Sequence, residues 1–164
     1  MRDAGVLVEL SRGLYRLADL PPLSQPDLVT VALKIPRGVI CLISALAYHD
    51  LTTQIPHAVD VALPRDAEKP RLDYPPTRLF WFSGQAFTSG VEKHELDGLT
   101  VKIYGPEKTV ADCFKFRNKI GLEVALEALK RCRENNRCSF QRLIHFSRMC
   151  RVERVMRPYL EVLQ

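Results

Sequence analysis

Hydrophobic and polar positions change their period along the chain, from strand-like alternation to helical spacing. Val6–Leu10 and Leu14–Leu17 are short strand-like runs, and the Ser11-Arg12-Gly13 segment between them predicts an opening β-hairpin. After the Pro21-Pro22 break, Asp27–Ile35 has the spacing of an amphipathic helix. A second, shorter helix is expected from about Ser44 to Leu51.

The middle of the chain predicts a sheet. Val59–Leu63 alternates between larger and smaller or polar residues, and Leu79–Phe82 is continuously apolar, which favours a strand covered on both faces. Asp97-Gly98 separates the runs Glu92–Leu96 and Leu99–Tyr104, a strong signal for a two-residue hairpin. We expect a central, mostly antiparallel sheet of three to five strands.

The last third is helical in pattern. Apolar residues recur at helical spacing after Glu107, Ser139 is placed to cap one helix, and Pro158 is expected to kink or divide the last. The prediction is an α+β fold with a C-terminal helical bundle packed on the sheet. We expect a hairpin over residues 1–20 and one larger domain over 21–164.

The positive charge is concentrated in this helical part. The net charge is +5, and from Glu107 onward there are 13 Lys and Arg against 7 Asp and Glu. A basic helical half indicates either an acidic partner, such as nucleic acid or an acidic protein surface, or simply a solvated face.

The cysteines and the hydropathy favour a cytoplasmic protein. Five cysteines, an odd number with no Cys-x-x-Cys pair, argue against a disulfide framework and against a zinc site, so a reducing cytosol is the simplest setting. No apolar run is long enough for a membrane span, and no signal peptide is expected.

The most informative stretch is Tyr104–Phe114, which predicts a strand end, a Gly-Pro break and a helix. It places four polar residues at or near the start of that helix, where they could contact a partner: Glu107, Lys108, Thr109 and Asp112. The simpler interpretation is an intradomain salt-bridge network of Glu107, Lys108 and Asp112.

An enzymatic alternative rests on acidic residues. Asp60 on a strand, together with Glu92 and Lys93 or with Glu107 and Lys108, could form the Mg²⁺ site of a nuclease-related enzyme. A Ser–His–Asp hydrolase is disfavoured, because no glycine flanks Ser44.

The opening hairpin has a basic tip, Arg12, with Arg16 beyond it. Such a hairpin is either an edge ribbon or the wing of a winged-helix domain, whose tip contacts the DNA backbone. Three helices precede the wing in that module, and the chain would then begin partway through it.

Three blocks of the sequence resemble the AbiEi-type antitoxins of bacterial type IV toxin–antitoxin (abortive-infection) systems. The blocks are Gly5–Arg16, Ser44–Pro56, and Tyr104–Cys113 with Lys119–Leu126. Members of this family pair a winged helix that represses their own operon with a C-terminal antitoxin domain. That domain counters a nucleotidyltransferase-like toxin without a stable complex and without catalysis.

The resemblance assigns residues to two roles. It implies that Arg12, Gly13 and Tyr15, with the neighbouring Arg16, form the wing that contacts operator DNA. It assigns the polar positions of the antitoxin domain to Ser44, His49, Thr52 and Gln54, together with Glu107, Lys108, Thr109 and Asp112. Since no recognition helix precedes the wing, DNA contact by this chain is expected to be weak and salt-dependent. No cofactor, metal or membrane association is expected.

Overall fold

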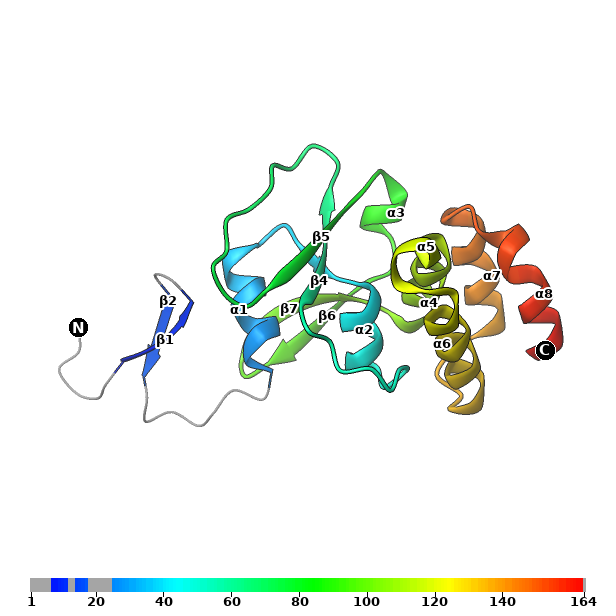
Figure 1. Cartoon of the computed structure of the whole chain (residues 1–164), viewed down its shortest axis with the longest axis horizontal. Helices are drawn as coiled ribbons and strands as arrows, with labels where there is room; N and C mark the ends of the chain where they lie inside the picture. The colour runs from blue at the N-terminus through cyan, green and yellow to red at the C-terminus, as the bar shows by residue number, and fades with distance from the viewer. Residues whose placement is uncertain (1–6, 12–13, 18–24, 164) are drawn as a thin grey trace.

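The computed structural model describes residues 7–11, 14–17 and 25–163, and it has the predicted α+β architecture (Figure 1). The strands are β1 (Leu7–Ser11), β2 (Leu14–Leu17), β3 (Val39–Ile40), β4 (Val59–Pro64), β5 (Thr77–Phe82), β6 (Val91–Leu96) and β7 (Leu99–Tyr104). The helices are α1 (Pro26–Lys34), α2 (Leu42–Tyr48), α3 (Gln85–Thr88), α4 (Pro106–Lys115), α5 (Arg117–Ile120), α6 (Leu122–Glu134), α7 (Phe140–Met149) and α8 (Glu153–Leu163).

The opening hairpin is confirmed, since β1 and β2 pair antiparallel. The predicted basic tip, Arg12 and Gly13, lies outside the described residues. Tyr15 and Arg16 belong to β2. Their assignment to a DNA-binding wing stays a prediction.

The central sheet has five strands in the order β5-β4-β3-β7-β6. The pairs β3–β4 and β6–β7 are antiparallel, whereas β4–β5 and β3–β7 are parallel. The sheet is therefore mixed and not mostly antiparallel. The parallel pairs arise because long connections, and not tight turns, join β4 to β5 and bring β7 beside β3.

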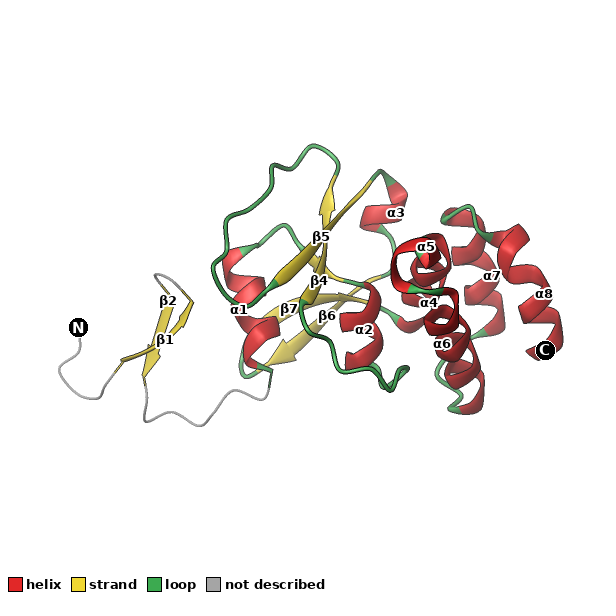
Figure 2. Ribbon diagram, in the orientation of Figure 1, coloured by secondary structure: helices red, strands yellow, loops and turns green. Residues whose placement is uncertain are grey.

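Each face of the sheet is covered by helices (Figure 2). On one face, Val29 and Val31 of α1 pack with Ile40, Val61 and Ile103. On the other face, α2, α4 and the C-terminal helices bury the side chains that point the opposite way from the same strands, such as those of Val39, Ala62 and Tyr104. Successive side chains of each strand therefore point alternately into two hydrophobic cores, one on each face of the sheet.

β5 lies at the edge of the sheet and leaves one face partly exposed, which corrects the expectation of a strand covered on both faces. Trp81 is 41% exposed, although its indole N–H donates to the carbonyl of Ala67 at 2.9 Å. Phe80 and Phe82 point inward and are buried. A run of apolar residues is insufficient to distinguish a central strand from an edge strand whose outer face is only partly covered by a loop.

The helices after Glu107 form a bundle at the opposite end of the molecule from the hairpin (Figure 1). Its core includes Phe114 from α4, Leu129 from α6, Leu143 from α7 and Met156 from α8. α8 continues through Pro158 and is not divided by it. None of the helices in the described part of the chain is long and apolar enough to cross a membrane.

Candidate functional site

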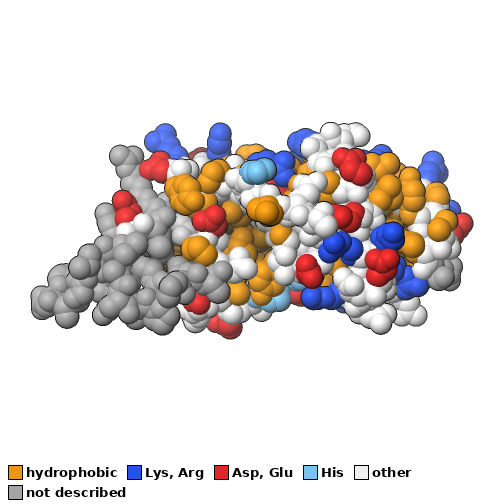
Figure 3. Space-filling view, turned by 60° about the horizontal axis from the view of Figure 1, so that its bottom comes forward, with side chains coloured by type: hydrophobic (Ala, Val, Ile, Leu, Met, Phe, Trp, Pro, Cys, Tyr) orange, Lys and Arg blue, Asp and Glu red, His pale blue; other side chains and the backbone are white. Residues whose placement is uncertain are grey.

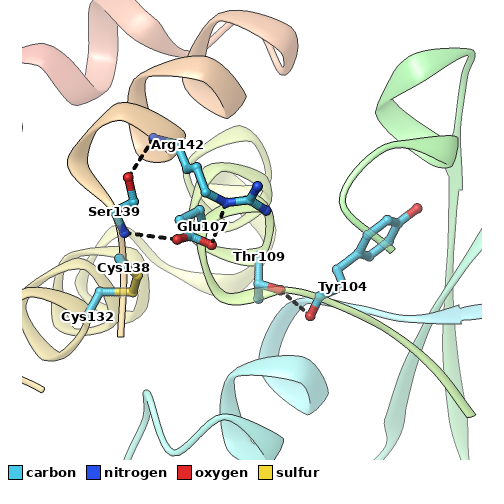
Figure 4. Close-up of a disulfide and its surroundings, with 7 residues drawn as sticks. All are labelled: Tyr104, Glu107, Thr109, Cys132, Cys138, Ser139 and Arg142. Carbon is cyan, nitrogen blue, oxygen red and sulfur yellow. Dashed lines mark hydrogen bonds and ion pairs between the residues drawn. A yellow bond between two sulfur atoms is a disulfide. The ribbon is translucent and has the colours of Figure 1, made fainter. Parts of the chain in front are cut away.

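The two main blocks behind the resemblance meet at one backbone atom, the carbonyl oxygen of Tyr104. This residue ends β7, and α4 begins with Gly105 as N-cap and Pro106 at its first position. His49 Nε2 lies 2.8 Å from the Tyr104 oxygen. Figure 4 shows the second contact, in which Thr109 Oγ1 donates to the same oxygen at 3.2 Å. The junction therefore ties the end of α2 to the first turn of α4.

Lys108 and Asp112 form an ion pair inside the protein, one turn apart on α4. Lys108 Nζ is 2.6 Å from Asp112 Oδ2, and the side chains are 0% and 1% exposed. The ammonium group also lies 3.8 Å from the ring centroid of Tyr104 and 4.9 Å from that of Phe82. Burial raises the pKa of Asp112, while the charge and hydrogen bond of Lys108 oppose that rise.

Glu107 connects α4 to the start of α7. Its Oε2 accepts a hydrogen bond from the backbone N–H of Ser139 at 2.9 Å, and its Oε1 lies 3.5 Å from Arg142 Nε (Figure 4). Ser139 is the N-cap of α7, as predicted, and its hydroxyl accepts from the N–H of Arg142 at 3.4 Å. A negative charge at this position complements the dipole of α7.

The expectation that the polar start of α4 contacts a partner is therefore wrong. All four residues are buried: Glu107, Lys108, Thr109 and Asp112. Each has an intramolecular partner, so they form internal connections of the domain. Sequence spacing placed these residues near a helix N-terminus, but α7 and β7 cover that end of the helix.

Three of the four polar residues predicted in the second block are also internal. The hydroxyl of Ser44 accepts from the N–H of Asp60 at 2.8 Å and donates to the Ala58 carbonyl at 3.3 Å. Thr52 donates to Glu127 Oε1 at 3.2 Å, which anchors this loop to α6. Ser44, His49 and Thr52 are buried, whereas Gln54 is exposed.

The acidic residues of the nuclease alternative do not converge. Asp60 is buried and accepts two hydrogen bonds from Arg78, at 2.7 and 2.9 Å, and one from the backbone N–H of Ile43 at 3.0 Å. Lys108 is paired with Asp112, and Glu107 faces α7. The carboxylate of Asp60 thus stabilises the start of α2 from the neighbouring strand.

A different polar cluster lies beside the Tyr104 junction. His49, Glu92 and His94 are, among the described residues, the one group of three whose side chains could hold a metal ion. His94 Nε2 is 2.9 Å from Glu92 Oε1, and His94 Nδ1 is 3.2 Å from the hydroxyl of Tyr48. Burial lowers the pKa of His49, which favours its neutral form.

The sequence contained one signal for this cluster. Glu92 and His94 are two residues apart on a predicted strand, so they point to the same face. Nothing in the sequence indicated that His49, more than 40 residues earlier, would lie against that face. His49 reaches that face because β3 pairs with β7 and α2 follows directly after β3.

Two of the five cysteines form a disulfide, which contradicts the expectation drawn from their odd number. Cys132 in α6 is bonded to Cys138 just before α7 (Figure 4). Cys41, Cys113 and Cys150 are free and buried. Burial raises the pKa of all three thiols, that of Cys150 to about 12.

The exposed surface of the helical half is rich in basic side chains. Arg148 and Arg157 both pair with Glu153, at 2.9 and 3.6 Å. Within the part of the chain that the structure describes, the exposed basic residues of the helical half that form no ion pair include Lys130, Arg137, Arg151 and Arg154. On the face shown in Figure 3, blue and red side chains intermingle over the helical end.

Comparison with known proteins adds no assignment. No model of a protein family matches the sequence, and no curated protein matches it.

Proposed function

We propose that this chain is the antitoxin part of an AbiEi-like type IV toxin–antitoxin system, acting by binding and not by catalysis in the cytoplasm. It counteracts a nucleotidyltransferase-like toxin without forming a stable complex with it. The observation that supports this proposal is the junction at the Tyr104 carbonyl. Two segments on which the resemblance rests, far apart in sequence, meet there through His49 and Thr109.

The polar residues of these segments serve the architecture of the domain. Because Lys108, Asp112 and Glu107 are buried and paired inside the protein, they are not available to contact a partner. The partner surface is instead the exposed basic surface of the C-terminal helices. Its unpaired cations include Arg151 and Arg154, which suit an acidic surface.

Co-expression tests this function. Cells carrying the toxin encoded beside this gene are expected to grow when residues 1–164 are produced, and to stop growing without them. The double variant Arg151→Glu, Arg154→Glu is expected to fold, as judged by circular dichroism, and to lose rescue. The matched control is Lys69→Glu, Arg71→Glu, the same charge change at exposed residues of the sheet half, which is expected to rescue.

Two outcomes would contradict the proposal. Absence of rescue by folded wild-type protein would exclude the antitoxin role of this chain. Rescue by the Arg151→Glu, Arg154→Glu variant at wild-type level would exclude the basic helical surface as the contact.

The regulatory role is proposed for the full-length protein, which contacts operator DNA through a winged helix. In this chain the contribution of the hairpin is phosphate contact by Arg12 and Arg16. Binding to a DNA duplex is therefore expected to be weak, to be independent of sequence, and to disappear as salt is raised. Fluorescence anisotropy over a salt series tests this, and the Arg12→Ala, Arg16→Ala variant is expected to reduce the salt slope.

A further inference from the structure

The residues His49, Glu92 and His94 bring three ligand atoms together from two elements. His49 follows directly after α2, while Glu92 and His94 project from the same face of β6. One ring nitrogen of each histidine and one carboxylate oxygen of Glu92 lie within 4.8 Å of one another. The proposed antitoxin role assigns no task to this arrangement of two imidazoles and a carboxylate.

The hydrogen bonds determine which nitrogen of His49 is available. A carbonyl oxygen can only accept, so the 2.8 Å contact with Tyr104 places the ring proton of His49 on Nε2. The lone pair is then on Nδ1. Metal-binding histidines commonly hold their second nitrogen in this way, by donating its N–H to a carbonyl or carboxylate.

His94 can bind a metal through Nε2 and still keep the hydrogen bond between its Nδ1 and Tyr48. Its Nε2 faces the carboxylate of Glu92, and its Nδ1 faces the hydroxyl of Tyr48. When a metal occupies the Nε2 lone pair, the ring proton moves to Nδ1 and is donated to the Tyr48 oxygen. A hydroxyl serves equally as donor or acceptor, so both tautomers are satisfied.

A glycine leaves the space that the carboxylate of Glu92 fills. A Cβ atom on Gly105 would lie 2.7 Å from Glu92 Oε2. The backbone of Gly105, with φ of −69° and ψ of 169°, is one that any residue adopts, so the conformation itself does not require glycine. The absence of a side chain at Gly105 therefore accommodates Glu92 in its place beside the two histidines.

We propose that His49 Nδ1, His94 Nε2 and the carboxylate of Glu92 bind a Zn²⁺ ion. Two imidazoles and one carboxylate suit zinc and disfavour Mg²⁺ and Ca²⁺, which prefer oxygen ligands. Tetrahedral coordination needs ligand atoms about 3.4 Å apart, so the cluster must contract. The side chains of His94 and Glu92 are 27% and 42% exposed, which lets them rotate inward and lets the ion enter. The fourth position belongs to water, as in open zinc sites.

Titration calorimetry of the full chain with ZnCl₂ tests the site. We expect one Zn²⁺ per chain, and at least a tenfold loss of affinity in both His94→Gln and Glu92→Gln. The matched control is His145→Gln, which changes an exposed histidine on α7 and is expected to bind as wild type does. Equal affinity of wild type and His94→Gln would overturn the proposal, as would loss of binding in His145→Gln.

A second experiment leaves all three ligands in place. Gly105→Ala is expected to displace the flexible carboxylate of Glu92 and to weaken zinc binding, with an unchanged circular dichroism spectrum. With Co²⁺ as a probe, wild type is expected to show the visible bands of a four- or five-coordinate nitrogen and oxygen site. A thiolate-to-cobalt band that persists in His94→Gln would place the metal on cysteines and overturn the assignment. Wild-type zinc affinity in Gly105→Ala would overturn the role of Glu92 as a ligand.

Discussion

Lys108 and Asp112 are sealed inside the protein as an ion pair, with 2.6 Å between Nζ and Oδ2. Cys150 Sγ lies 3.4 Å from the other carboxylate oxygen, Oδ1, and the ring of Tyr104 covers the ammonium group. Removing two charges from water is costly, and their attraction offsets that cost only while both are present. The pair therefore makes α4 sensitive to the loss of either partner.

Lys108→Met is expected to lower the free energy of unfolding by about 3–5 kcal/mol, because it leaves the carboxylate of Asp112 buried without a cation. Denaturant titration measures this loss. Arg157→Met, which removes a cation from an exposed pair with Glu153, is the matched control and is expected to change stability little. In the double variant Lys108→Met, Asp112→Leu, much of the lost stability is expected to return. A Lys108→Met protein as stable as wild type would contradict the argument.

The effect of Lys108→Met is expected to depend on pH. Without Lys108 the pKa of Asp112 rises further, because the charge and hydrogen bond of the lysine no longer oppose the effect of burial. For an acid whose pKa is higher in the folded state than in the unfolded state, stability is greatest below the unfolded pKa and is lost as pH rises through the folded pKa. The difference between wild type and variant should therefore be larger at about pH 8 than at about pH 5. Equal differences at both pH values would show that Asp112 does not carry the effect.

Asp60 is predicted to act in stability and not in catalysis. Arg78→Met removes its bidentate partner but leaves the hydrogen bond from Ile43, and the side chain of Arg78 is 44% exposed. We therefore expect a moderate loss of about 1–3 kcal/mol in the free energy of unfolding, measured by denaturant titration. Arg37→Met, which breaks the exposed pair with Asp66, is the control, with an expected loss of about 0–1 kcal/mol. Equal losses in the two variants would contradict the structural role.

Local features of the fold could be predicted from the sequence because neighbouring residues determine them. Asp97 and Gly98 both have positive φ, 54° and 81°, as a two-residue hairpin turn demands. Pro106 starts α4 and Ser139 caps α7 where their chemistry suggested. These signals depend on one or two residues and their own backbone.

The candidate site was predictable only in part, because the burial of its residues depends on segments that are distant in sequence and pack against them. Lys108 and Asp112 have the spacing of an exposed pair on a helix, and only the packing of the later helices against α4 makes them internal. His49 and His94 meet through strand order, which no local pattern encodes. The pairing of Cys132 with Cys138 depends on the turn between α6 and α7.

Glu107→Ala is expected to loosen α7 while leaving the sheet intact. The substitution removes the acceptor of the Ser139 N–H and the partner of Arg142, so one buried connection between α4 and α7 is lost. We expect about 1–3 kcal/mol of destabilisation and faster amide hydrogen exchange in α7 than in β7. Arg142→Ala keeps the hydrogen bond from the Ser139 N–H to Glu107 and is expected to lower the free energy of unfolding less. An equal increase in the rate of amide hydrogen exchange across the whole chain would argue against a local connection between α4 and α7.

The disulfide between Cys132 and Cys138 is expected to contribute about 2 kcal/mol, because it closes a short loop in the unfolded chain. Protein purified without reductant should show three thiols after denaturation, and five after reduction. In the native state the three free thiols should react slowly, since burial raises their pKa and excludes the reagent. Reductant should lower the melting temperature of wild type and leave that of Cys138→Ser unchanged. Five reactive thiols in the unreduced, denatured protein would show that the bond does not form and would contradict this prediction.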